Sequence, residues 1–161
     1  MVEHKRSIAY LAFDPGFKGA MAMQIDDKPA QAYAYNTDTY ARVLYDLSES
    51  PDLIVKAYIE GVHSMPRQGV KSVFSFGTNF GIIQGMLMAN CIPFTLVNPR
   101  LWQKHFEINE RDRKVRKSKI CERMQEKYPH INFYSERGAL LDGISDALAI
   151  LTYARDVNLK V

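Results

Sequence analysis

The hydrophobic positions along this chain switch several times between strand-like and helix-like spacing. Nearly continuous apolar runs at residues 7–13 and 53–59 are typical of strands that are covered on both faces of a sheet. Two more strands are expected at 19–23 and 28–35, where short turns favour antiparallel hairpins, and a fifth is expected at 92–97. The pattern therefore predicts a mixed α/β sheet in which three antiparallel strands precede two parallel ones.

Apolar residues spaced three and four apart predict helices between and after these strands. The expected helices lie at residues 39–47, 72–89, 99–106 and 113–127, and a last one begins at Asp142. The short helix at 99–106 is expected to bury Trp102. The helix at 113–127 is strongly basic and is expected to pack through Val115, Ile120 and Met124.

The long helix at 72–89 carries two distinct lines of residues. The expected core stripe consists of Val73, Phe76, Phe80, Ile83 and Leu87. A second line consists of Gly77, Gly81 and Gly85, and each glycine costs about 1 kcal/mol relative to alanine in a helix interior. Three glycines in line imply that another backbone comes close, which is either the sheet or the same helix of a second subunit.

Length and composition indicate a single globular domain spanning residues 1–161, of which 47% are hydrophobic and 24% charged. No apolar run has the length of a membrane span, and the N-terminal residues lead directly into a strand, so neither an anchor nor a signal peptide is expected. Cys91 and Cys121 are isolated and show no metal-binding spacing. Free thiols favour a reducing, cytoplasmic location.

Positive charge is concentrated in one segment, although the net charge of the chain is only +3. Residues 100–127 hold ten of the 21 basic side chains and only five acidic ones, so this segment carries +5 and the remainder −2. A basic segment on a mildly acidic body indicates a polyanionic partner. A solvated helix face without a binding role is the alternative.

Four acidic residues stand out because of their positions. Asp142 and Asp146 share one face of an otherwise apolar helix, and two buried like charges would destabilise each other unless a cation lay between them. Alternatively, Asp142 is an N-cap and Asp146 a solvated acid in the first turn. Asp14 and Glu60 each end a strand of buried character and are followed closely by glycine. Asp14 could be a plain turn residue and Glu60 a solvent-exposed one.

The chain resembles the RuvC family of Holliday-junction resolvases within the ribonuclease H-like fold, and it is most similar to the short, phage-type members found in phages and some bacteria. The resemblance implies that the protein acts in the cytoplasm of a bacterium or of a phage-infected host cell. The resemblance spans roughly residues 8–155 and rests on the order and spacing of several short motifs. These are Asp14-Pro-Gly with Gly19-Ala20, Tyr58-Ile59-Glu60, Met65-Pro-Arg-Gln-Gly-Val, Ser75-Phe-Gly-Thr-Asn-Phe-Gly-Ile-Ile-Gln-Gly-Met-Leu, Asn98-Pro-Arg-Leu-Trp-Gln-Lys and Asp142-Gly-Ile-Ser-Asp146-Ala-Leu-Ala.

The resemblance implies a metal site. Asp14, Glu60, Asp142 and Asp146 would hold two Mg²⁺ ions, for which Mn²⁺ would substitute, and carboxylate oxygens are the ligands that these hard ions prefer. Because the last two acids are four residues apart rather than three, the sequence leaves open which of them binds metal directly. Lys117 lies where the family tends to carry a functional lysine, so it is expected to act with the four acids in catalysis.

The remaining candidate residues would contact DNA. Residues 61–71 form an expected loop with polar and cationic side chains that either touch phosphate or are simply solvated, and His63 stands where bacterial members commonly carry a stacking aromatic residue. The candidates in and after this loop are His63, Arg67, Gln68, Lys71 and Lys104. The candidates on the basic helix are Arg113, Lys114, Arg116 and Lys117.

The expected activity is Mg²⁺-dependent hydrolysis of phosphodiester bonds in four-way DNA junctions, with symmetric nicks made by a homodimer during DNA recombination and repair. One alternative is a nuclease with a broader range that also cuts flaps and forks. Another is a catalytically inactive nucleic-acid-binding protein of the same fold. A ribonuclease H acting on RNA–DNA hybrids would share the metal site.

Overall fold

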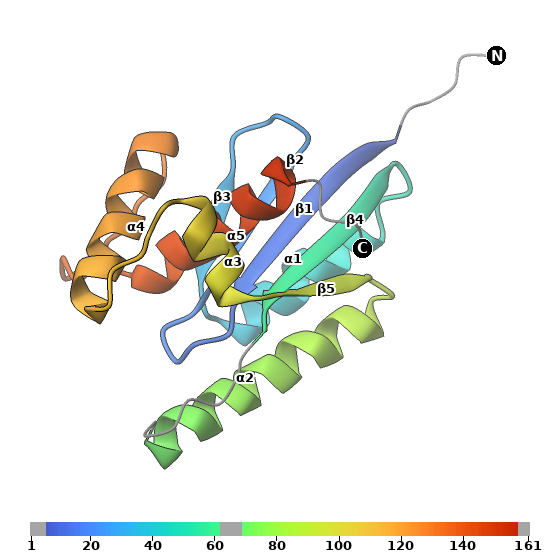
Figure 1. The fold of residues 1–161 in the computed structure, drawn as a ribbon. Coiled ribbons are helices and arrows are strands. Elements are labelled where there is room, and N and C mark those ends of the chain that lie inside the picture. Colours follow the sequence, from blue (N-terminus) through green and yellow to red (C-terminus); the bar gives the residue numbers. More distant parts are fainter. Residues whose placement is uncertain (1–5, 62–68, 158–161) are drawn as a thin grey trace.

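The computed structural model describes residues 6–61 and 69–157. Its centre is a five-stranded sheet with the strand order β3-β2-β1-β4-β5 (Figure 1). The strands are β1 (Ser7–Asp14), β2 (Ala20–Ile25), β3 (Gln31–Ala34), β4 (Leu53–Glu60) and β5 (Phe94–Val97). β1 is antiparallel to β2 and parallel to β4, β2 is antiparallel to β3, and β4 is parallel to β5. The mixed sheet predicted from the sequence is confirmed.

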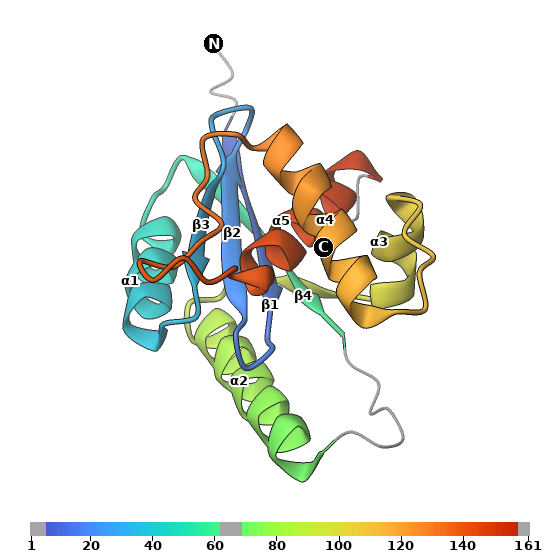
Figure 2. The ribbon, with the colours of Figure 1, turned by 90° about the vertical axis from the view of Figure 1, so that its left-hand side faces the viewer.

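Five helices cover the two faces of this sheet. They are α1 (Thr37–Ser48), α2 (Val70–Ala89), α3 (Pro99–His105), α4 (Arg113–Lys127) and α5 (Asp142–Asp156). α1 and α2 pack on one face, and α3, α4 and α5 pack on the other (Figures 1 and 2). Apart from shifts of a few residues at their ends, the helices form where the hydrophobic spacing predicts them.

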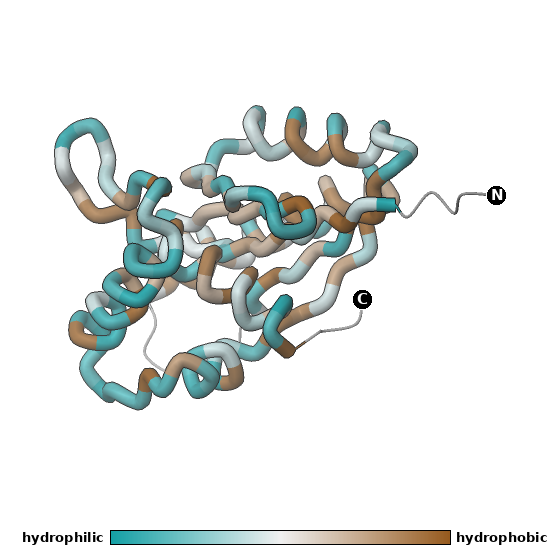
Figure 3. Tube along the Cα trace, turned by 90° about the horizontal axis from the view of Figure 1, so that it is seen from above, coloured by the Kyte–Doolittle hydropathy of each residue, from teal (hydrophilic) through white to brown (hydrophobic). Residues whose placement is uncertain are grey.

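Side chains that alternate along the strands separate two cores. Leu11 and Phe13 of β1 pack toward α1 and α2, whereas Ala12, between them, packs toward the other three helices. Together with Ala20 and Ala22 of β2, Ala12 gives that second face a floor of small side chains, which lets α5 lie close to the sheet. The chain trace is accordingly hydrophobic mainly in its interior and hydrophilic over most of its outer turns (Figure 3).

Short polar residues fix where three helices begin. The side chain of Asn36 accepts a hydrogen bond from Thr39 N at the start of α1, and Asp112 accepts one from Val115 N at the start of α4. Asn98 does the same for α3, followed by a proline at the first helical position. α5 has no such cap, so its first turn is held by contacts of another kind, described below.

The structure corrects the expected packing of α2. Ile83 and Leu87 are buried, but Val73 is 41% exposed and Phe74, one residue on, is 74% exposed, because this half of the helix extends beyond the edge of the sheet (Figure 1). A Cβ built on any of Gly77, Gly81 or Gly85 would meet nothing within 4 Å, so the glycine line does not face the sheet. No helix in the described ranges is both long and apolar enough to cross a membrane.

The expected packing of α4 also needs one correction. Ile120 and Met124 are buried as predicted, whereas Val115 is exposed. The third buried residue of α4 is Cys121, which packs in the same core as Ile120 and Met124. The first turn of α4 is therefore free to present side chains to solvent on several sides.

Candidate active site

Two carboxylates are brought together by the pairing of β1 and β4. The strands run parallel, and Phe13 lies opposite Ile59, so the next residues, Asp14 and Glu60, end neighbouring strands at the same edge of the sheet. This carboxyl edge is where open α/β sheets place their ligands. Asp14 follows the alternation of Ala12, so its position in β1 faces the layer of α3, α4 and α5.

The N-terminus of α5 is held directly against the turn that follows Asp14. Gly143, in the first turn of α5, lies so close to this turn that an added Cβ would be 2.1 Å from Lys18 O. From the opposite side, the Asn79 side chain of α2 donates a hydrogen bond to Gly16 O, at 3.1 Å. Gly16 N in turn donates to Asp14 Oδ1 at 2.9 Å. Contacts from both faces of the sheet therefore fix the turn and its carboxylate.

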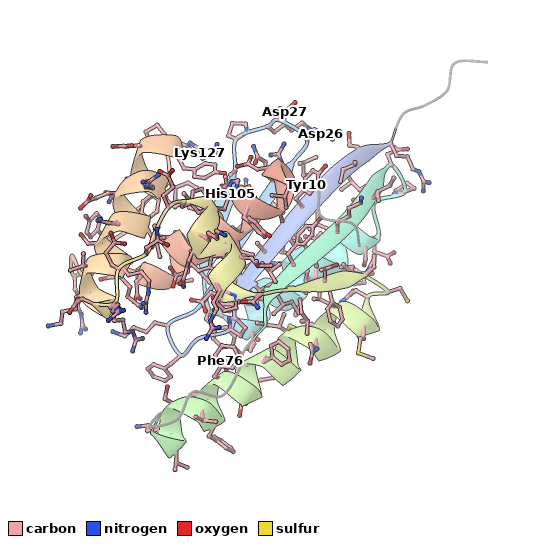
Figure 4. The ribbon with its side chains drawn as sticks, viewed as in Figure 1. Tyr10, Asp26, Asp27, Phe76, His105 and Lys127 are labelled. Carbon is pink, nitrogen blue, oxygen red and sulfur yellow. The ribbon has the colours of Figure 1, made fainter. Side chains whose placement is uncertain are left out.

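The edge of the sheet, the first turn of α5 and the start of α4 enclose a cavity of about 490 Å³. All five residues predicted to be catalytic line this cavity, namely Asp14, Glu60, Asp142, Asp146 and Lys117. Arg113 adds a second cation, and Phe76 of α2, labelled in Figure 4, lies at the opposite wall. The structure thus gathers side chains that are spread over most of the sequence into one pocket.

Burial and mutual repulsion act on three of these acids. Burial and, to a smaller extent, the charge of Asp14 together raise the pKa of Asp146 to about 7, against the opposing effect of Lys117. Burial also raises the pKa of Glu60 well above its usual value, and the charges of Asp14 and Asp146 act in the same direction. The pKa of Asp14 is raised by burial as well, although the hydrogen bond from Gly16 lowers it. Perturbed carboxylates clustered in one cavity are typical of functional sites.

Two of the acids have specific partners. Trp102 Nε1 donates a hydrogen bond to Glu60 Oε1 at 3.2 Å, and the indole ring is only 1% exposed. The ammonium group of Lys117 forms an ion pair with Asp142 Oδ2. Asp142 does not cap α5, because the capping position belongs to Leu141, and Asp146 lies inside the cavity rather than in bulk solvent. The purely local alternative for these two acids is therefore wrong.

The predicted DNA contacts fall into three groups. Arg113 and Lys117 line the acidic cavity, and Lys114 lines a second groove that adjoins it. Lys71 and Lys104 are exposed but lie outside both, and Arg116 donates to Glu110 O at 3.3 Å. His63, Arg67 and Gln68 fall outside the described residues.

Sequence reasoning missed several residues of the site. Lys18 and Phe17 enter the cavity from the turn after β1, which the sequence marks only as a turn. Asn79 belongs to one of the motifs of the resemblance, but nothing in the sequence indicates that its side chain anchors Gly16. The bond between Trp102 and Glu60 joins residues 42 apart in sequence, and no local signal predicts it. Only the motif that contains Trp102 indicates that this residue belongs to the site.

The donor chemistry of the cavity fits small divalent cations. Among the residues that the structure describes, four carboxylates and no histidine or cysteine line it, and carboxylate oxygens are the donors that Mg²⁺ and Mn²⁺ prefer. Within residues 6–61 and 69–157, no group of three or more acidic, histidine or cysteine side chains has its donor atoms close enough together to hold a metal ion. Three of the carboxylates instead have other partners: Asp14 accepts from Gly16 N, Glu60 accepts from Trp102 Nε1, and Asp142 pairs with Lys117 Nζ.

Comparisons with known proteins place the fold. No family model matches the chain, and no curated protein sequence is similar to it. Thermus thermophilus RuvC in complex with a Holliday junction substrate aligns with a TM-score of 0.56 and 9% sequence identity, covering 92% of this chain and 96% of that chain. A second structure of Thermus thermophilus RuvC aligns with a TM-score of 0.56 and 10% identity, covering 93% and 96%. The predicted RuvC-like, ribonuclease H-like fold is confirmed, and the activity is a separate question.

Proposed function

We propose that this protein is a Mg²⁺-dependent, structure-selective DNA endonuclease that resolves four-way junctions. The observation that carries the proposal is the meeting of Asp14, Glu60, Asp142 and Asp146 with three cationic side chains in one cavity, at the carboxyl edge of a RuvC-like sheet. The Thermus thermophilus protein of the same fold is described with a Holliday junction substrate, which makes branched DNA the first substrate to test. The expected relation to phage-type members and a cytoplasmic location stay predictions.

Asp14, Glu60 and Asp146 are the residues best placed to hold metal, because the charge of Asp14 raises the pKa of the other two and the charge of Asp146 raises that of Glu60. Asp142, whose carboxylate faces Lys117, would complete the set once that ion pair opens. When bound, two divalent ions activate a water molecule and stabilise the leaving oxygen of a phosphodiester. Mn²⁺ is expected to substitute for Mg²⁺, since it accepts the same oxygen ligands.

The cations of α4 would hold the substrate in place. Lys117 and Arg113 line the cavity beside the acids, so a phosphate that enters it meets positive charge on one side and carboxylates on the other. The Lys117 ammonium, once released from Asp142, would lie where the scissile phosphate carries its negative charge. Because phosphate contacts dominate such binding, affinity for DNA should fall steeply with salt.

The exposed side of α2 supports a homodimer. Val70 and Phe74 are mostly exposed, and Gly77 and Gly81 continue their line along the helix with nothing within 4 Å of an added Cβ. An apolar stripe with a flat glycine section fits a second copy of the same helix, approached closely. Two active sites related by a two-fold axis would suit a junction of the same symmetry.

Replacing Gly81 with leucine is expected to weaken self-association by about tenfold to a hundredfold, because the new side chain must be packed between two helices. The fold of each subunit should be unaffected or slightly stabilised, since the space above Gly81 is open within the chain. Sedimentation velocity over a range of concentrations measures the change. Tyr45→Ala, at an exposed aromatic residue on α1, is the matched control. Equal self-association of the Gly81 variant and the wild type would place any dimer interface elsewhere.

Replacing Trp102 with phenylalanine is expected to reduce Mg²⁺ affinity by about tenfold to a hundredfold, the usual effect of losing a hydrogen bond that orients a ligand. The change removes the indole N–H from Glu60 and keeps an aromatic ring in the core. Calorimetric titration with Mg²⁺ measures the affinity, and in the wild type the fluorescence of this single tryptophan gives a second readout.

Tyr128→Phe is the control for Trp102→Phe. It also removes a buried hydrogen bond from the same core, the one between Tyr128 Oη and Thr152 Oγ1, but away from the acids. Its Mg²⁺ affinity should equal that of the wild type. If both variants bind the ion as the wild type does, Trp102 supports the core and not the metal site.

A cleavage panel tests the proposed function directly. Four-way junctions, flaps, forks, linear duplexes and RNA–DNA hybrids, each end-labelled, are incubated with the protein with and without Mg²⁺. Paired nicks in junctions that require Mg²⁺ support the proposal. Equal cutting of flaps and forks indicates the broader nuclease, cutting only of hybrids indicates a ribonuclease H, and binding without cutting of any substrate indicates the inactive binding protein.

A further inference from the structure

A second groove opens beside the acidic cavity and shares part of its wall. It has a volume of about 450 Å³ and lies between α4, the turn after β1 and residues 134–140. Lys18, Lys117 and Asp142 line both spaces, so the groove continues directly from the carboxylates. A polymer whose scissile group lies in the cavity would therefore extend into this groove or leave past its mouth.

The lining of the groove is amphipathic, unlike that of the cavity. Lys18 and Lys114 are exposed along it, and within the described ranges neither forms an ion pair. Cys121 and Leu140 contribute apolar surface, and Tyr134 adds an aromatic ring that is 46% exposed. Unpaired cations beside an exposed aromatic ring match the two parts of a nucleotide, its phosphate and its flat base.

The aromatic ring is held in place before any ligand arrives. Tyr134 pairs with Leu140 in an isolated antiparallel bridge, and Tyr134 N donates to Asn132 Oδ1 at 2.9 Å. At the tip of the ring, Gln125 Nε2 of α4 donates to Tyr134 Oη at 3.2 Å. A ring fixed at both ends loses little conformational freedom when a base stacks on it, which favours binding.

We propose that this groove binds the nucleotide next to the scissile phosphate, with its base against Tyr134 and its outer phosphate between Lys18 and Lys114. The proposal rests on the proposed nuclease function and adds a subsite to it. A nucleotide of the substrate strand fits better than an isolated phosphate, because an isolated phosphate would leave the apolar floor and the ring unused. The groove would also hold the strand in register with the carboxylates.

Fluorescence of 2-aminopurine tests the stacking. The analogue is placed in turn on the 5′ and the 3′ side of the mapped cleavage position, and the junction is bound in Ca²⁺. The wild type is expected to quench the fluorescence at one of the two positions. Tyr134→Ala should lose this quenching and weaken binding about tenfold, and Tyr134→Phe, which keeps the ring, should restore both.

The salt dependence of binding tests the phosphate contact. Lys114→Ala is expected to reduce the slope of log affinity against log salt by about one phosphate contact. Lys127→Ala, on the same helix but at the end of the molecule opposite Phe76, is the matched control and should leave the slope unchanged (Figure 4). In Lys114→Ala, the cleavage rate at saturating DNA should change by a smaller factor than the KM for DNA, since Lys114 lines the groove and not the cavity.

The outcomes separate the groove from the proposed function. If the wild type cuts junctions but Tyr134→Ala quenches and binds like the wild type, the groove assignment is overturned while the nuclease stands. If Lys114→Ala and Lys127→Ala have equal slopes, the phosphate contact is overturned. A wild type that neither binds nor cuts any branched DNA overturns the proposed function and the groove together.

Discussion

Replacing Asp146 with asparagine is expected to abolish Mg²⁺-dependent cleavage and, in metal-free buffer at neutral pH, to raise the melting temperature. The loss of cleavage should be roughly a thousandfold or more, equivalent to about 4 kcal/mol of transition-state stabilisation. Both effects have one cause: burial and the charge of Asp14 make an ionised Asp146 unfavourable without a cation, and asparagine removes that charge. A residue kept for function at the expense of stability is expected to behave in this way.

The pH dependence of stability gives the same test without a substrate. The pKa of Asp146 is about 7 in the folded protein and close to 3.8 in the unfolded chain, so between these values the folded state binds the additional proton. The contribution of Asp146 to the stability of the metal-free protein is therefore complete below pH 4, and it is lost as the pH rises through 7. Asp14 and Glu60 shift in the same direction. Thermal melts from pH 5 to pH 8 measure the slope, which Mg²⁺ should reduce.

Asp38→Asn is the control for Asp146→Asn. Asp38 is an exposed acid in the first turn of α1, so its replacement should leave cleavage unchanged and, if anything, lower stability slightly through the helix dipole. If Asp146→Asn cleaves junctions at the wild-type rate, the assigned site is wrong. If it is inactive but melts lower than the wild type at neutral pH, the acid contributes to folding through contacts and its charge is not the source of strain.

The sequence was informative about the site wherever regular secondary structure fixes direction. Strand ends place Asp14 and Glu60 at one edge, because parallel neighbours share a polarity, and helical spacing places Asp142 and Asp146 on one face. These positions follow from periods of two and 3.6 residues, which hydrophobic patterns report directly. The hydrophobic pattern alone does not predict that Asp14 and Glu60 lie next to Asp142 and Asp146. That prediction came from the family resemblance.

Sequence reasoning failed where burial depends on which elements lie alongside each other. Val73 has the same helical spacing as the buried Ile83, but its half of α2 extends past the sheet and has no strand beneath it. Val115 is likewise exposed, although it continues the apolar spacing of the buried Ile120 and Met124. A pattern identifies an apolar face of a helix but not the element that covers it, and for α2 the covering element proposed above is a second copy of the chain.

The contact that brings the two halves of the site together is the most sensitive point in the fold. Replacing Gly143 with alanine is expected to destabilise the protein by about 3 kcal/mol and to reduce cleavage by about a hundredfold or more. The added Cβ would be 2.1 Å from Lys18 O and 2.8 Å from Gly19 C, and both atoms belong to backbone that cannot rotate away. Either α5 or the turn after β1 must therefore move, and the separation between Asp146 and Asp14 changes with it. Chemical denaturation and single-turnover cleavage measure the two effects.

Gly69→Ala separates this steric effect from the general cost of replacing a glycine. Gly69 precedes α2 with an ordinary φ of −62°, and an added Cβ there would meet nothing within 4 Å, so the loss should be at most about 1 kcal/mol. If Gly143→Ala is as stable and as active as Gly69→Ala, the N-terminus of α5 does not rest on the turn after β1. The approach of Asp146 to Asp14 would then rest on the packing of α5 over the small side chains of Ala12, Ala20 and Ala22.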